Sequence, residues 1–222
     1  VGAFLLLSYG ATGAFFTTLQ RRVAFATESP NPGAAATLRA YLGEEMVPVL
    51  QGLGFQTREL ESPAGDGGHR GLFLIAERIE APHLPTVLSY GHGDVVPGME
   101  GQWQAGRGPW TLRAEGERWY GRGTADNKGQ HSINLGAIAA VLAARGGRLG
   151  FNLKLLFEMG EEIGSPGLAE FCAQHREALR ADLFLASDGP RLRADRPTLF
   201  LGSRGIVNFR LEVRLRTQGY HS

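Results

Sequence analysis

The sequence contains a single cysteine, Cys172, among its 222 residues. One cysteine excludes a disulfide within the chain, and we therefore expect a reducing compartment, the cytoplasm. Cys172 lies in a helical pattern, SPGLAEFCAQHREALR, where a small core side chain is expected. A catalytic thiol would need a histidine beside it at a loop or helix start, and His175 lies on a different face.

The sequence also lacks an excess of either charge. It has 23 Lys and Arg against 22 Asp and Glu, a formal net charge of +1, and no basic tract stands out. Nucleic acids and anionic membranes both bind to concentrated positive surface. We therefore expect neither as a partner.

No apolar run is long enough to cross a membrane. The first nineteen residues are apolar, but they are interrupted at positions 8–10 and 12–13, and no basic residue precedes them. A spanning helix needs about 20 apolar residues, and a signal peptide begins with a basic segment. We expect neither feature here. Because the sequence begins without Met, we also expect its natural start to lie upstream.

Glycine, by contrast, is abundant, with 32 of 222 residues, about twice the usual ~7%. The glycines cluster in loops that follow apolar segments, where they allow special backbone angles and close approach. The apolar fraction of 43% is ordinary for a globular protein. The length suits one good-sized core together with part of a second domain.

Apolar periodicity predicts strands alternating with helices. The predicted helices are residues 13–26, 34–53 with a kink at Pro48 and a stop at Gly54, 129–145, and one that starts with Ser165 as cap and Pro166 as first residue. The predicted strands are residues 55–60, 72–79, 86–90, 151–157 and 181–186, with a hairpin at 111–120. This alternation is typical of an α/β domain with a mixed, largely parallel sheet flanked by helices in three layers.

The last part of the sequence has a different character. Residues 198–201 and 206–216 are predicted to be strands, and VNFRLEVRLR alternates cleanly between apolar and polar residues. Such alternation is typical of an antiparallel sheet with one exposed face. It predicts that a second domain begins here.

Acidic residues and one histidine follow the ends of the predicted strands. His92 follows one strand, Glu161 and Glu162 follow another, and Asp188 follows a third, while Asp126 lies in a glycine-rich loop before a helix. In sheets of this class, ligands gather outside the carboxyl ends of the strands. We therefore expect these side chains to share one site.

Taken singly, each motif also has an ordinary structural explanation. The segment GHGD is compatible with a strand-end turn capped by Asp94, Asp126 with a solvated helix start, and Glu161–Glu162 with an acidic turn. A phosphate loop at GRGTADNKG is not supported. Its lysine lacks the preceding glycine and the following Ser or Thr, and a carboxylate would repel phosphate.

Together, the residues suit a pair of divalent cations. His92 and Asp94 are two residues apart in an extended segment and point to the same face, so Asp94 can accept the second ring N–H of His92. Asp126 can bridge two ions. Glu161 and Glu162 are adjacent and cannot both face one metal in the same way, so one can bind while the other acts as general base.

The predicted ligand set is His92, Asp126 and Asp188 on one ion, with Asp126 and Glu162 on the other. Mixed nitrogen and oxygen ligands suit zinc, with manganese and cobalt as alternatives. Two such ions polarise a carbonyl and activate a shared water, which is hydrolytic chemistry. The second ion is one protein ligand short in this sequence.

Four segments resemble the family of two-zinc amidohydrolases and peptidases that includes acetylornithine deacetylase, succinyl-diaminopimelate desuccinylase, aminoacylase, carboxypeptidase G and carnosinase. They are SYGHGDVVPG, GRGTADNKGQ, EMGEEIGSPG and ASDGP, in family order, and the match runs from about Leu19 to the end. The resemblance implies the same ligand set, with Asp126 as the bridge. It also implies that Glu161 is the general base, that Asp94 orients His92, and that the Asp126–Asn127 peptide bond is cis.

The resemblance further implies a catalytic domain interrupted by a smaller α+β lid domain that mediates homodimerisation. Residues 1–203 would be the N-terminal part of the metal-binding catalytic domain, and residues 204–222 the start of a truncated lid. His221 resembles the lid histidine that steadies the oxyanion in the partner subunit's site. The family's last zinc ligand lies in a C-terminal segment that this sequence does not contain. We therefore expect residues 1–222 alone to bind metal incompletely and to be inactive.

The predicted function is that of a zinc-dependent metallopeptidase or amidohydrolase. Its substrate is expected to be a small N-acyl amino acid or a short peptide such as a dipeptide, as for the deacetylases and carboxypeptidases of the family. Hydrolysis of an N-carbamoyl amino acid and a non-catalytic scaffold that keeps the fold are the alternatives. Intact Glu161 argues against the scaffold, because a pure binder needs no base beside its ligand.

Overall fold

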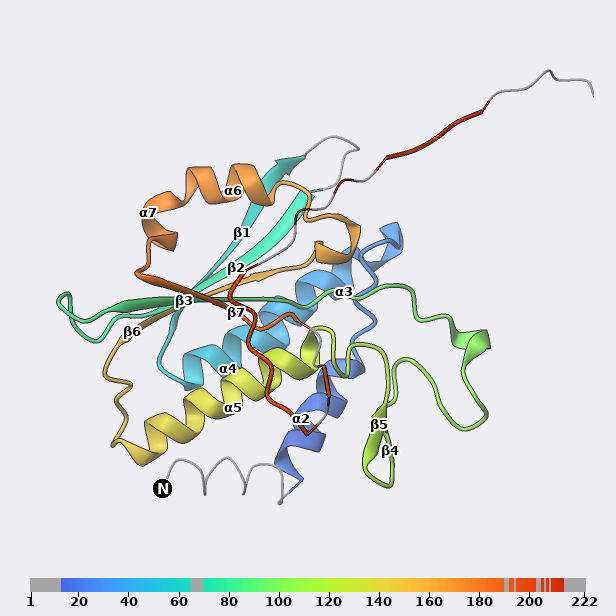
Figure 1. The fold of residues 1–222 in the computed structure, drawn as a ribbon, viewed down its shortest axis with the longest axis horizontal. Helices are drawn as coiled ribbons and strands as arrows, with labels where there is room; N and C mark the ends of the chain where they lie inside the picture. The colour runs from blue at the N-terminus through green and yellow to red at the C-terminus, as the bar shows by residue number, and fades with distance from the viewer. Residues whose placement is uncertain are drawn as a thin grey trace, which may run out of the picture. The chain divides into compact units, whose positions relative to one another are not determined.

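The computed structural model describes residues 13–64, 70–189, 192–193, 195–202, 205, 207 and 209–213. The chain divides into two units, residues 1–188 and 189–222, which we describe separately. In the first unit a five-stranded mixed sheet lies between two layers of helices (Figure 1). The predicted three-layer α/β architecture is confirmed.

The sheet brings the ends of three strands to one edge. Its strands run in the spatial order β1 (Gln56–Ala64), β2 (Arg70–Arg78), β6 (Asn152–Glu158), β3 (Thr86–His92) and β7 (Leu183–Ala186). The pairs β1–β2 and β2–β6 are antiparallel, whereas β6–β3 and β3–β7 are parallel. His92 lies opposite Glu158, and Tyr90 lies opposite Ala186. The loops after β3, β6 and β7 therefore start side by side.

Alternate residues of the central strands pack against the two helical layers. Leu74 and Leu155 belong to the cluster beneath α3 (Ala35–Ala40), α4 (Val47–Gly52) and α5 (Lys128–Ala144). Phe73 and Leu156 face the other way, toward α6 (Leu168–Gln174) and α7 (Arg176–Leu179). This two-sided burial explains why the strands have continuous apolar runs rather than alternation.

The predicted helix at residues 34–53 forms in three segments. A single turn of 3₁₀ helix (Pro32–Ala34) leads into α3, a π-helical turn (Tyr41–Met46) follows, and α4 completes it. Pro48 has no N–H to donate to the residue four positions earlier, and its ring crowds that carbonyl. A widened π turn just before the proline accommodates this. Gly54, with a φ of 79°, follows the end of the helix as predicted.

The first predicted helix is α2 (Ala14–Val23), and the hairpin consists of β4 (Arg113–Glu115) and β5 (Arg118–Tyr120). The predicted helix start at Ser165–Pro166 is wrong, because α6 begins at Leu168. The Ser165 hydroxyl instead donates to Glu158 Oε1 at 2.8 Å. A buried carboxylate therefore takes the group that was expected to cap the helix.

In the second unit, the predicted strand at residues 198–201 is wrong, since those residues have no strand structure. Neither an apolar run nor alternation forms a strand without a hydrogen-bonded neighbour. Of the strand predicted at 206–216, positions 207 and 209–213 are described, and none of them forms a strand. The domain boundary at 203/204 stays a prediction, and His221 lies outside the described residues.

No helix in the described ranges is long and apolar enough to span a bilayer.

Candidate metal centre

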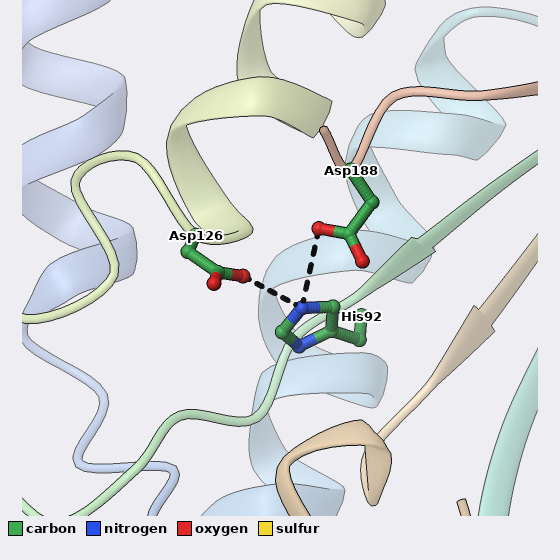
Figure 2. A group of neighbouring side chains, drawn as sticks. All are labelled: His92, Asp126 and Asp188. Atoms are coloured by element: carbon green, nitrogen blue, oxygen red, sulfur yellow. Dashed lines mark hydrogen bonds and ion pairs between the residues drawn. The ribbon is translucent and has the colours of Figure 1, made fainter. Parts of the chain in front are cut away.

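Three side chains of metal-ligating type meet at the sheet edge (Figure 2). His92 is the last residue of β3, Asp188 lies two residues after β7, and Asp126 lies two residues before α5. The Nε2 atom of His92 is 2.9 Å from Asp126 Oδ1 and 3.7 Å from Asp188 Oδ1. One ligand atom of each residue lies within 4.8 Å of the other two. Ligand atoms that share a zinc ion are at most about 4.4 Å apart, so the three are close to binding geometry.

Asp94 is fully buried and holds two parts of the site together. Its Oδ1 lies 3.3 Å from His92 Nδ1, which leaves Nε2 of the imidazole facing Asp126 and Asp188. The same carboxylate accepts the backbone N–H groups of Glu161 at 3.2 Å and Glu162 at 3.1 Å. Asp94 therefore fixes the imidazole and the acidic loop relative to each other.

Glu161 and Glu162 lie in a single 3₁₀ turn (Glu161–Ile163) that follows β6. Glu161 Oε2 is 3.9 Å from His92 Nε2, at the border of the cluster. Burial raises the pKa of Glu161, and Asp188 adds to the shift while His92 opposes it. Burial also raises the pKa of Glu162, and the negative charge of Asp126 raises it further. The two glutamates therefore lie in the negative field of the cluster, although neither is one of its three members.

The charges of the site favour a bound cation. Burial lowers the pKa of His92, but the carboxylates of Asp188 and Asp94 outweigh burial and raise it to about 11. Burial raises the pKa of Asp188, yet the charge of His92 and a hydrogen bond from Asn127 leave it below its ordinary value. A protonated imidazole thus balances the negative charge of the carboxylates. A bound divalent ion would balance the same charge, and the imidazole would then be neutral. One imidazole and several carboxylates fit zinc, manganese or cobalt.

The loop before α5 places Asp126. The Asp126–Asn127 peptide bond is cis, as the family resemblance implies. Lys128, the first residue of α5, is buried and donates from Nζ to the carbonyl of Phe25 at 2.7 Å. Burial lowers the pKa of Lys128 to about 7. The loop is therefore anchored to the segment after α2 by a lysine and not only by its own turn.

Gly129→Ala is expected to disrupt this loop. A Cβ atom on Gly129 would overlap the carbonyl oxygen of Thr124, a backbone atom that cannot rotate away. We expect a loss of at least about 2 kcal/mol of unfolding free energy, within the usual cost of overpacking. Gly52→Ala is the matched control, because a Cβ atom there meets nothing within 4 Å. Chemical denaturation measures both variants, and equal stabilities would contradict the expectation.

Several buried polar residues behind the site carry no signal in the sequence. Glu158 accepts hydrogen bonds from Tyr90 Oη at 2.6 Å and from Ser165. Asn127 is fully buried and contacts Asp188. His131 is buried and hydrogen-bonded to Tyr41. Only the position of Asn127 beside Asp126 could have drawn attention to it.

Comparison with known proteins gives consistent matches. The family model described as "Peptidase family M20/M25/M40" matches residues 88–219. The Beta-Ala-His dipeptidase of Mus musculus is 32% identical over 219 residues, which cover 94% of this chain and 44% of that protein. The cysteinylglycine-S-conjugate dipeptidase of Corynebacterium striatum is 36% identical over 151 residues, covering 67% of this chain and 32% of that protein. The chain thus spans less than half the length of these relatives.

A solved structure shows the same fold. The crystal structure of human carnosine dipeptidase 1 superimposes with a TM-score of 0.75 and 27% sequence identity. The match covers 85% of this chain and 40% of that chain. The three-layer arrangement that gathers His92, Asp126 and Asp188 is therefore not peculiar to this sequence.

Proposed function

The chain belongs to peptidase family M20/M25/M40, and on that premise we propose that the protein is a metal-dependent hydrolase of dipeptides or small N-acyl amino acids. The observation that carries the proposal is the meeting of His92, Asp126 and Asp188 at the edge of the sheet. A dipeptide is favoured as substrate, since the two relatives described above are both named dipeptidases.

In this proposal, His92, Asp126 and Asp188 hold one divalent ion, and Asp126 with Glu162 holds a second. Zinc is the first candidate, with manganese and cobalt as alternatives. When bound, such ions polarise a carbonyl and lower the pKa of water. The family resemblance assigns the remaining ligand of the second ion to a segment outside residues 1–222.

Glu161 acts as the general base in this proposal. It takes a proton from the attacking water and delivers that proton to the leaving amine. Its carboxylate lies beside the cluster, 3.9 Å from His92 Nε2, and its raised pKa makes it a better proton acceptor. Asp94 holds the backbone N–H of Glu161 and so keeps the base in place.

The longer-range parts of the proposal rest on the family resemblance. Residues 204–222 would open a lid domain, and the full-length protein would be a homodimer in the cytoplasm. His221 would reach the partner subunit's site and steady the oxyanion. Residues 1–203 would supply most of the metal ligands.

Full-length protein is expected to purify with divalent transition metal and to hydrolyse dipeptides. Metal content is measured by inductively coupled plasma mass spectrometry. Turnover is measured on β-alanyl-histidine, cysteinylglycine, and N-acetyl and N-succinyl amino acids. Chelation should abolish turnover, and zinc, manganese or cobalt should restore it. Turnover of the N-acyl substrates alone would show that the substrate is an N-acyl amino acid and not a dipeptide. Protein that is both metal-free and inactive would contradict the proposal.

A further inference from the structure

The side-chain amide of Asn127 contacts all three ligand-bearing segments. Asn127 directly follows Asp126, and it is fully buried. Its Oδ1 accepts the backbone N–H of His92 at 3.3 Å. Its Nδ2 donates to the carbonyl of Ser187 at 2.9 Å and to Asp188 Oδ1 at 2.8 Å. A backbone N–H can only donate and a backbone carbonyl can only accept, so these two groups fix which end of the amide is oxygen.

His131 and Tyr41 continue the hydrogen bonds away from the site. His131 Nδ1 lies 3.2 Å from Asn127 Oδ1, which can only accept, so Nδ1 carries the proton. His131 Nε2 is then an acceptor, and Tyr41 Oη donates to it at 2.6 Å. Both side chains are buried, and the His131 ring also packs edge-on against Phe157. The hydrogen bonds thus run in one direction toward the metal site, from Tyr41 to His131 to Asn127 to Asp188.

The backbone that leads to Asp188 is held by few strand contacts. It follows β7, a strand of four residues, and among the described strands β7 pairs only with β3. The Asp188 side chain is 25% exposed, and its separation from His92 Nε2 is 3.7 Å. The bond from Asn127 is shorter and involves a charged acceptor, the stronger class of hydrogen bond.

We propose that Asn127 is a positioning residue that sets Asp188 and His92 for metal binding, with His131 and Tyr41 holding its amide in the required orientation. The inference rests on the proposed function, because it assigns Asn127 to the same metal centre. The amide supplies a donor to Asp188 without adding a charge to the site.

The test is the zinc affinity of Asn127→Ala in the full-length protein, measured against a chromophoric chelator. We expect affinity to fall about 10- to 100-fold, the usual cost of losing a residue that orients a metal ligand. Cobalt-substituted protein should show an altered visible absorption spectrum, because the geometry of Asp188 changes.

Asn152→Ala is the matched control. Asn152 is also buried, at the start of β6 and so at the opposite end of that strand from Glu158. Its amide donates to the carbonyls of Ala81 at 2.9 Å and Leu84 at 3.0 Å, and accepts the backbone N–H of Glu80 at 2.8 Å. This variant should lose stability and yet bind zinc within about twofold of wild type, below the range for orienting residues.

Two outcomes would count against the inference. Wild-type zinc affinity in a folded Asn127→Ala protein would overturn it, as would equal weakening in Asn152→Ala, which would indicate general destabilisation. Asn127→Ser is measured in parallel with the same expectation, so that a folding failure of the alanine variant still leaves a test. Wild-type protein that binds no zinc would instead refute the proposed function itself.

Discussion

Replacing Glu161 with glutamine in the full-length protein is expected to lower kcat at least about 100-fold, the low end of general-base contributions. Glutamine keeps the size of the side chain but cannot accept a proton from water. The backbone N–H of residue 161 still donates to Asp94, so the loop should keep its position. Metal content should therefore stay at the wild-type level while turnover falls.

Glu162→Gln is the matched control for this prediction. The neighbouring glutamate lies in the same 3₁₀ turn, and its N–H donates to the same Asp94 carboxylate. If Glu162 is a metal ligand, its variant should lose metal as well as turnover, whereas the Glu161 variant should lose turnover alone. Full activity in Glu161→Gln would contradict the role of Glu161 as general base. Metal loss in that variant would indicate that Glu161 is the metal ligand and Glu162 the base.

The strand ends that carry the site could be predicted because local patterns determine them. Runs such as NLKLLFE are buried on both faces, and in an α/β sheet such strands end at a common edge. That rule was sufficient to expect His92 and Asp188 near each other. The helix end before Gly54 followed from local chemistry too.

The supporting residues could not be predicted, because their roles depend on contacts between distant segments. Tyr41 and His131 are 90 positions apart in sequence, and neither has a pattern that distinguishes it from an ordinary core residue. Ser165 shows the opposite failure. Its local sequence favours a helix cap, but the buried Glu158 carboxylate takes its hydroxyl. The need of a buried carboxylate for a hydrogen-bond donor here overrides the local preference for a helix cap.

If Asp126 bridges two ions as proposed, replacing it with asparagine in the full-length protein should reduce bound metal from two ions to at most one per chain. Asp126 Oδ1 already faces His92 Nε2 at 2.9 Å, and a bridging role needs the second oxygen for the other ion. Asparagine keeps one oxygen and replaces the other with an NH₂ group, which is a donor and cannot bind a cation. We expect affinity for the second ion to fall more than about 100-fold, beyond the effect of losing an orienting residue.

The fold should tolerate this change, which makes the measurement informative. The Asp126 side chain is 68% exposed, so the substitution removes little packing. Asp182→Asn is the control, because Asp182 accepts the backbone N–H of Thr86, the first residue of β3, at 2.8 Å, whereas the metal cluster lies at the end of that strand. Isothermal titration with zinc gives the stoichiometry of both variants. Two ions bound to Asp126→Asn with wild-type affinity would contradict the proposed bridging role of Asp126.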